Sequence, residues 1–158
     1  MKNFIYYDEG LFVKHERDED PAGVSYTMHT HELFEIYYFL SGNMVFWAEG
    51  TPYQLQSGDI MLFNISEAHT IELKGDSPYE RVAINFSRDI FDRLDPERIL
   101  QKPFTERALG KGNLIRPKDF EGNFWRECIE KIIAPTDDRR LQALTYLPAL
   151  LGEIYQAS

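Results

Sequence analysis

The strongest constraint on the fold of this chain is a change of pattern near Phe86. Before it, runs such as FEIYYFL, DIMLF and YERVAINF are separated by short breaks that contain Gly, Pro or Asp. Strands spaced about 8–12 residues apart and split by such turn residues are typical of an all-β sandwich or barrel. The runs IYYFL and IMLF do not alternate polar and apolar residues, which predicts strands covered on both faces. We therefore expect a β-barrel with an N-terminal arm over residues 1–86.

Residues 87–158 have a helical pattern instead. The run SRDIFDRL begins with Ser87 as a candidate N-cap, and apolar residues recur at helical spacing within 117–135 and again within 137–157. Pro148 interrupts the last pattern and should kink that helix or split it. The fold class predicted for the whole chain is therefore mainly β, a jelly-roll-like barrel followed by two or three C-terminal α-helices.

Composition excludes several classes of function. The chain has 158 residues, about one domain, and no apolar run near the ~20 residues of a membrane helix. Residues 1–86 carry five Lys/Arg against 14 Asp/Glu, and residues 87–158 carry 12 of each, so no strongly basic face is expected. The chain alone should bind nucleic acid poorly. With Cys128 as the single cysteine and no signal-peptide pattern, a cytoplasmic location is predicted.

Two histidines and a glutamate share one parity in the run HTHELFEIYYFLSG. In an extended strand His29, His31 and Glu35 would point to the same side, and His69 opens a later strand with apolar partners on its face. Histidine nitrogens with one carboxylate suit a divalent metal such as Zn, Mn, Fe or Ni. The alternative is a polar pocket floor that hydrogen-bonds an organic ligand or only itself.

Aromatic residues follow on the same stretch. Tyr37 and Phe39 share the parity of Glu35 and could line a pocket in which flat rings stack on the C–H faces of a sugar, or could simply fill the barrel core. Trp47 is a further candidate, although the parity of its own strand leaves its face open. Arg81 could anchor an anionic group of a ligand, or form a surface ion pair.

These residues carry a resemblance to the cupin superfamily. The fixed positions of its first motif are all filled, as Gly23-x5-His29-x-His31-x3-Glu35-x6-Gly42. The second motif departs from the family pattern, because Asn64 stands where proline is usual, Ser66 where glycine is usual, and Leu73 in place of asparagine. The resemblance implies a double-stranded β-helix with a central pocket, and a metal held by His29, His31, Glu35 and His69.

A narrower resemblance covers more of the chain. The segments HELFEIYYFLSG, YQLQSGDIMLF, AHTIEL and YERVAINF are similar to the N-terminal effector-binding domain of AraC-type bacterial transcription regulators. That likeness implies a small-molecule effector, for example a carbohydrate, bound in the barrel, and a homodimer formed through the helices of residues 87–158. It also implies that DNA is bound only by a separate helix-turn-helix domain, absent from this chain.

The second hypothesis is a stand-alone metal-dependent cupin enzyme, such as a sugar isomerase or dioxygenase. A storage-type or adaptor cupin is a third hypothesis.

Overall fold

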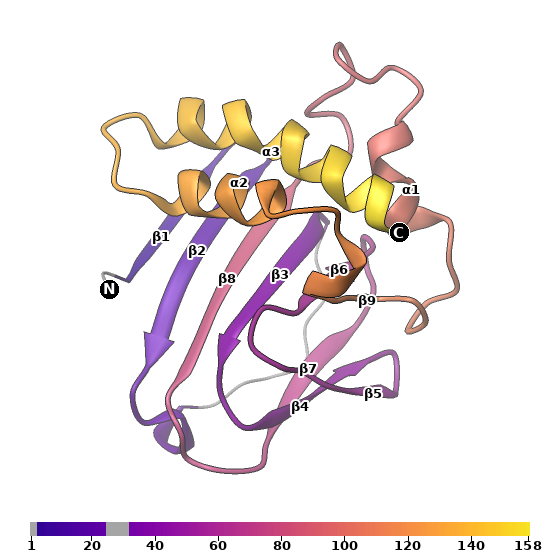
Figure 1. Ribbon diagram of the computed structural model, residues 1–158. Helices are drawn as coiled ribbons and strands as arrows, with labels where there is room; N and C mark the ends of the chain where they lie inside the picture. The colour runs from indigo at the N-terminus through magenta and orange to yellow at the C-terminus, as the bar shows by residue number, and fades with distance from the viewer. Residues whose placement is uncertain (1–2, 25–31) are drawn as a thin grey trace.

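A computed structural model describes residues 3–24 and 32–158 of the chain (Figure 1). Its strands are β1 (Phe4–Asp8), β2 (Leu11–Asp18), β3 (Phe34–Ser41), β4 (Met44–Ala48), β5 (Thr51–Gln54), β6 (Ile60–Phe63), β7 (His69–Leu73), β8 (Tyr79–Phe86) and β9 (Leu114–Ile115). Its α-helices are α1 (Lys102–Thr105), α2 (Phe124–Ile133) and α3 (Arg139–Ala157), and short 3₁₀ helices lie at Pro21–Gly23, Ile99–Gln101 and Pro117–Asp119. No helix within these ranges is both long and apolar enough to cross a bilayer.

The strands form two antiparallel sheets. The larger has the order β1-β2-β8-β3-β6-β9, and the smaller has the order β5-β4-β7. Strands β3 and β8, which are central in the larger sheet, pair Glu35 with Asn85 and Ile36 with Ile84. The predicted cupin-type β-barrel followed by C-terminal helices is confirmed.

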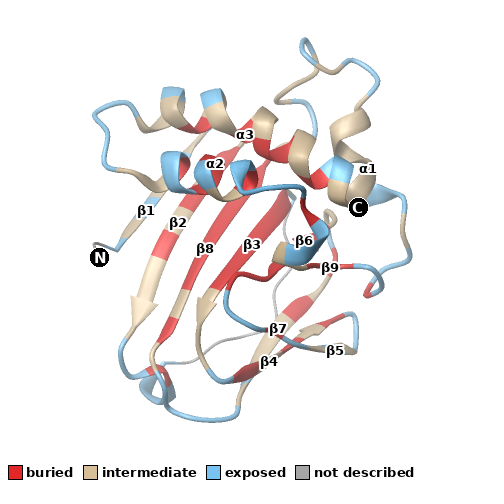
Figure 2. Ribbon diagram, viewed as in Figure 1, coloured by how far each residue is buried: buried red, intermediate tan, exposed pale blue. Residues whose placement is uncertain are grey.

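Two apolar cores lie on the two faces of the larger sheet. Because side chains alternate along a strand, Ile84 and its even-numbered neighbours on β8 face the helices, whereas Ala83 and Asn85 face the smaller sheet. Helices α2 and α3 cross the first face, where buried residues of the strands and helices make one continuous cluster (Figure 2). The second cluster fills the barrel and contains Tyr37, Phe39, Met44, Phe46, Ala48, Leu55, Met61, Phe63 and Tyr79. The strands before Phe86 and the helices after it therefore share a core.

The segment after Phe86 differs from the helix expected there. Residues 88–94 form successive turns, as in the hydrogen bond from Leu94 N to the carbonyl of Phe91 at 3.0 Å. Pro96 disfavours helical geometry at Asp95, whose carboxylate instead accepts from the backbone N–H of Ile99 at 3.0 Å. The expected helix over SRDIFDRL is therefore wrong, because local turn chemistry outcompetes a short amphipathic pattern.

The two longer helices, α2 and α3, differ in their limits from the helices expected within 117–135 and 137–157. Within 117–135, Gly122 has φ +70° and separates the first 3₁₀ turn from α2, which begins only at Phe124. Helix α3 runs without a break through Pro148. The expected split of the helix at Pro148 is therefore wrong. Leu147 and Leu150, on either side of the proline, are buried in the core. Packing of this kind supplies most of the stability of helices in proteins.

Candidate functional site

Glu35, His69 and Asn85 form a buried polar cluster where the two sheets face each other. Their exposed fractions are 5%, 2% and 2%. Asn85 Nδ2 on β8 donates to Glu35 Oε1 on β3 at 3.0 Å. From the smaller sheet, His69 Nε2 approaches Glu35 Oε2 to 3.3 Å. The Glu35 carboxylate thus contacts polar side chains from both sheets inside the barrel.

The backbone carbonyl of Glu67 orients the imidazole of His69. It lies 3.1 Å from Nδ1, and since a carbonyl oxygen only accepts, Nδ1 carries the proton and Nε2 faces the Glu35 carboxylate. Burial disfavours the imidazolium, yet the Glu35 carboxylate and the Glu67 carbonyl outweigh it and raise the pKa of His69. The Nε2 position therefore favours a positive charge, carried by a proton or by a bound cation.

Aromatic rings form the walls around this imidazole. The ring of His69 stacks on Phe63 at 3.9 Å between centroids with planes 12° apart, and more distantly on Phe46 at 5.9 Å. Tyr37 contacts Phe46 edge-on at 4.7 Å. The polar cluster is thus embedded in flat apolar surfaces, a combination common in small-molecule sites.

One polar atom of the cluster is left over. Within the part of the chain that the structure describes, the buried Asn85 Oδ1 accepts no hydrogen bond. A buried acceptor without a donor costs about 1–3 kcal/mol, so such atoms usually mark a place where another group donates. Asn85 was not among the residues singled out from the sequence, although a polar residue at the parity of Arg81 and Ala83 in the run YERVAINF was a usable signal.

A second polar group lies further along β8. Tyr37 and Tyr79 share a hydrogen bond between their hydroxyls, and the guanidinium of Arg81 lies 4.3 Å from the centroid of the Tyr79 ring. Arg81 also pairs with Asp18 at 2.9 Å and Glu16 at 3.3 Å. Burial is the largest cause that raises the pKa of Tyr79 to about 12. The Arg81 charge is thus compensated by two carboxylates of β2, in partly buried ion pairs.

The structure brings together only part of the predicted site. Glu35 and His69 meet as expected, and Tyr37 and Phe39 line the same barrel core. Trp47 does not join them: it alternates with the inward-facing Phe46 and donates its indole N–H to Glu72 at 3.0 Å on the outer side of the smaller sheet. The remaining predicted residues, His29 and His31, lie outside the described residues.

Within the described ranges, no three His, Cys, Asp or Glu side chains converge as a metal-binding group. The chemistry of the two predicted ligands that are described nevertheless fits a divalent cation. Glu35 Oε2 and His69 Nε2 face each other, and the Nδ1 contact to a carbonyl is the kind of outer hydrogen bond that orients metal-bound histidines. No metal identity follows from two ligands.

Comparison with protein families matches residues 17–126 to the AraC-like ligand binding domain. The chain belongs to this family. Among curated proteins, this AraC-like domain is similar to the Oxalate-binding protein of Thermotoga maritima, with 38% identity over 65 residues, or 40% of this chain and 54% of that protein. The chain therefore spans about half the length of the curated relative that it matches.

Solved structures with local similarity include cupins. A cupin protein from Bacteroides fragilis is 29% identical, with a TM-score of 0.43 over 50% of this chain and 67% of its own. A predicted oxalate decarboxylase from Thermotoga maritima is 28% identical, with a TM-score of 0.39 over 49% of this chain and 64% of its own.

Proposed function

We propose that this AraC-like domain is the effector-sensing part of a transcription regulator and binds a small molecule inside its barrel. The observation that carries the proposal is the buried Glu35–His69–Asn85 cluster, because an acceptor without a donor stands there beside a carboxylate and aromatic walls. Membership of a ligand-binding family supports the same reading. Residues 1–86 would hold the effector, and residues 87–158 would connect this barrel to the rest of the regulator.

The chemistry of the cluster favours an effector that carries hydroxyl groups. A hydroxyl can donate to Asn85 Oδ1 or to Glu35, and the C–H face of a sugar ring can stack on Tyr37 or Phe39. Carbohydrates and polyols have both features. Trp47 lies on another surface, and Arg81 is held by carboxylates of β2, so neither is part of the site that we propose.

A metal-dependent cupin enzyme is the second candidate. It is favoured by the Glu35–His69 geometry and by similarity to a protein named for oxalate binding. A divalent metal bound there would supply Lewis acidity or activate oxygen. His69 Nε2 and Glu35 would hold it together with the predicted ligands His29 and His31, and the Glu67 carbonyl would keep Nδ1 of His69 protonated.

Binding and turnover separate the two candidates. The purified chain is screened by thermal unfolding against millimolar sugars, polyols, sugar acids and oxalate, each with and without Mn²⁺, Ni²⁺ or Zn²⁺. A sensor ligand present at 100 times its dissociation constant should stabilise the fold by about 2.7 kcal/mol, a rise of roughly 5–10 °C in Tm for a chain of this size. Asn85→Leu should abolish the shift, and Trp47→Phe, on the outer face, should retain it. Failure of every compound to shift Tm would contradict the sensor, whereas metal-dependent consumption of oxalate, lost in His69→Gln, would favour the enzyme.

A further inference from the structure

Glu67 connects the barrel site to the helical half of the chain. Its carboxylate is completely buried. Oε1 accepts from Asn64 N at 2.9 Å and Oε2 from Gly110 N at 2.6 Å. Arg107 donates to both oxygens, from Nη2 at 2.7 Å and from Nη1 at 2.9 Å. Every strong acceptor position of this carboxylate is therefore used.

The same residue touches the barrel site with its backbone. The carbonyl of Glu67 accepts from His69 Nδ1 at 3.1 Å, so any rotation or shift of the imidazole acts directly on the turn at residues 64–67. This turn has little freedom to absorb such a shift, because the Glu67 carboxylate also holds Asn64 N and thus closes it from within. The position of the His69 imidazole is therefore coupled, through the backbone of Glu67, to that of the Glu67 carboxylate.

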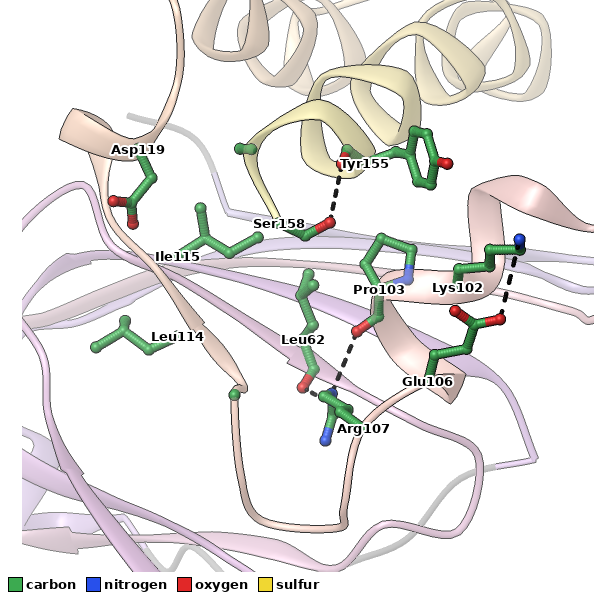
Figure 3. Close-up of a pocket in the computed structure, with 12 residues that line it drawn as sticks. Leu62, Lys102, Pro103, Glu106, Arg107, Leu114, Ile115, Asp119, Tyr155 and Ser158 are labelled. Atoms are coloured by element: carbon green, nitrogen blue, oxygen red, sulfur yellow. Dashed lines mark hydrogen bonds and ion pairs between the residues drawn. The ribbon is translucent and has the colours of Figure 1, made fainter.

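Arg107 passes the contact on to the helical half of the chain. It follows α1, donates from Nε to the carbonyl of Pro103 at 3.2 Å, and donates from Nη2 to the carbonyl of Leu62 at 2.9 Å. Figure 3 shows Arg107 beside Leu62 of β6 and Pro103 of α1, whose carbonyls accept from its guanidinium. A fork of this kind fixes direction as well as charge, which a lysine cannot do.

The loop at residues 106–113 is docked by more than the ion pair. Gly110 has φ +76°, and a Cβ there would lie 2.6 Å from the carbonyl oxygen of Ala48, the residue that pairs with His69 across the smaller sheet. The hydroxyl of Tyr53 donates to the Gly110 carbonyl at 2.7 Å. Both the side chain of Glu67 and the strand beside His69 therefore hold this loop.

The far side of Arg107 is less tightly filled. A cavity of about 570 Å³ lies between α1, β9 and the end of α3, lined among others by Pro103, Arg107 and Tyr155 (Figure 3). Interiors are otherwise packed like organic crystals, so empty volume is where a small displacement can be accommodated. The space between α1 and the C-terminal end of α3 is therefore not completely filled by side chains.

We propose that Glu67 and Arg107 form the link that transmits occupancy of the barrel site to the loop at residues 106–113 and to α1. Glu67 acts as a positioning residue for His69, and Arg107 carries the resulting displacement out of the barrel. This inference rests on the proposed function, because a link has a role only if something binds at His69. The link would carry a change at His69 out of the barrel to the helical half of the chain.

Hydrogen exchange measured by mass spectrometry on the whole chain tests the link. The site is perturbed in two ways, by Ni²⁺ alone as a probe and by His69→Asn. In the wild type, Ni²⁺ should slow exchange in residues 106–113 at least fivefold, and His69→Asn should speed it at least fivefold. In Arg107→Lys both responses should fall below twofold, while calorimetry gives a Ni²⁺ affinity within threefold of wild type. Arg98→Lys is the matched control, because Arg98 makes a similar two-bond contact to Asp92 in the same half of the chain but not to the barrel; it should respond like the wild type.

The outcomes distinguish the link from the site. Undiminished responses in Arg107→Lys would overturn the link, and so would a wild-type loop that responds neither to bound Ni²⁺ nor to His69→Asn. If calorimetry shows no Ni²⁺ binding while His69→Asn still acts through Arg107, the link stands and the metal-dependent enzyme, the second candidate function, is contradicted. Should Arg107→Lys not fold, Tyr53→Phe, which loses the hydroxyl contacts to Gly110 and Asn113 in the same loop, should halve the responses. Unchanged responses there would count against the link.

Discussion

The backbone N–H of Asn64 donates to the Glu67 carboxylate at 2.9 Å and closes the turn that leads into β7. A proline, usual at this position in the cupin motif that the sequence resembles, has no N–H and could not make this bond. In the same turn, between Asn64 and Glu67, Ser66 has φ +63°. This is the left-handed region of backbone conformation, which favours glycine, the residue usual at this position of the motif. The departures of this chain from the motif therefore coincide with a turn that its own hydrogen bonds hold in place.

The left-handed conformation of Ser66 makes Ser66→Gly an informative change. Relief of the strain should contribute about 1–2 kcal/mol, and the greater freedom of glycine in the unfolded chain should offset about 0.4–1 kcal/mol. We expect the free energy of unfolding, measured in urea, to stay level or to rise by up to about 1.5 kcal/mol. Ser57→Gly, a serine outside this turn, serves as the control and should not stabilise. A loss of more than 1 kcal/mol in Ser66→Gly would show that the serine side chain itself supports the turn.

Glu67→Gln removes one partner of a buried ion pair. The amide cannot accept from Asn64, Gly110 and Arg107 in the same way, and Arg107 would keep a charge without its counterion. Removal of one partner from a buried pair costs about 3–5 kcal/mol, so the urea midpoint should fall sharply. Asp92→Asn, which breaks the exposed pair with Arg98, should change the midpoint little. Equal effects of the two substitutions would contradict a structural role for the Glu67 pair.

Sequence reasoning located the barrel and part of the site for a physical reason. Alternation along a strand places Glu35, Tyr37 and Phe39 on one side wherever the strand begins, and their positions follow that rule. Trp47 shows the limit of the same rule. When no residue of a strand is known to point inward, the sequence does not show which alternate residues face the core. An error of one position then assigns every side chain to the wrong face.

The Glu67–Arg107 pair lay beyond such reasoning. Neither a period nor a motif relates a turn between two strands to a loop 40 positions later, and only the docking of that loop on the smaller sheet brings the two charges together. Asn85 is an intermediate case. Its polarity within an apolar strand was visible, but its partner Glu35 depends on the pairing of β3 with β8, which no local pattern reveals.

Tyr79 should make stability depend on alkaline pH. Its pKa is raised from 10.0 to about 12, first by burial, so the folded state holds its proton after the unfolded state has lost it. The associated stability is present below pH 10 and is lost as pH rises from about 10 to 12, in total roughly 2–3 kcal/mol. Tyr79→Phe should be less stable than wild type at pH 8, because it leaves the buried Tyr37 hydroxyl without its partner, and this difference should shrink toward pH 12. Urea titrations at several pH values measure it, and a constant difference would exclude the tyrosine as the cause.

Leu141 offers a test of the proposed homodimer through the C-terminal helices. Its side chain is 63% exposed on α3, whereas Leu147 and Leu151 of the same helix are buried. If α3 forms the dimer interface, a charge at this position should weaken association at least tenfold, about 1.4 kcal/mol, without loss of Tm. Sedimentation velocity over a concentration series compares Leu141→Glu with Leu94→Glu, since Leu94 is 65% exposed outside α3. A wild type that stays monomeric at high concentration would contradict the homodimer, and two variants that associate equally would exclude Leu141 from its interface.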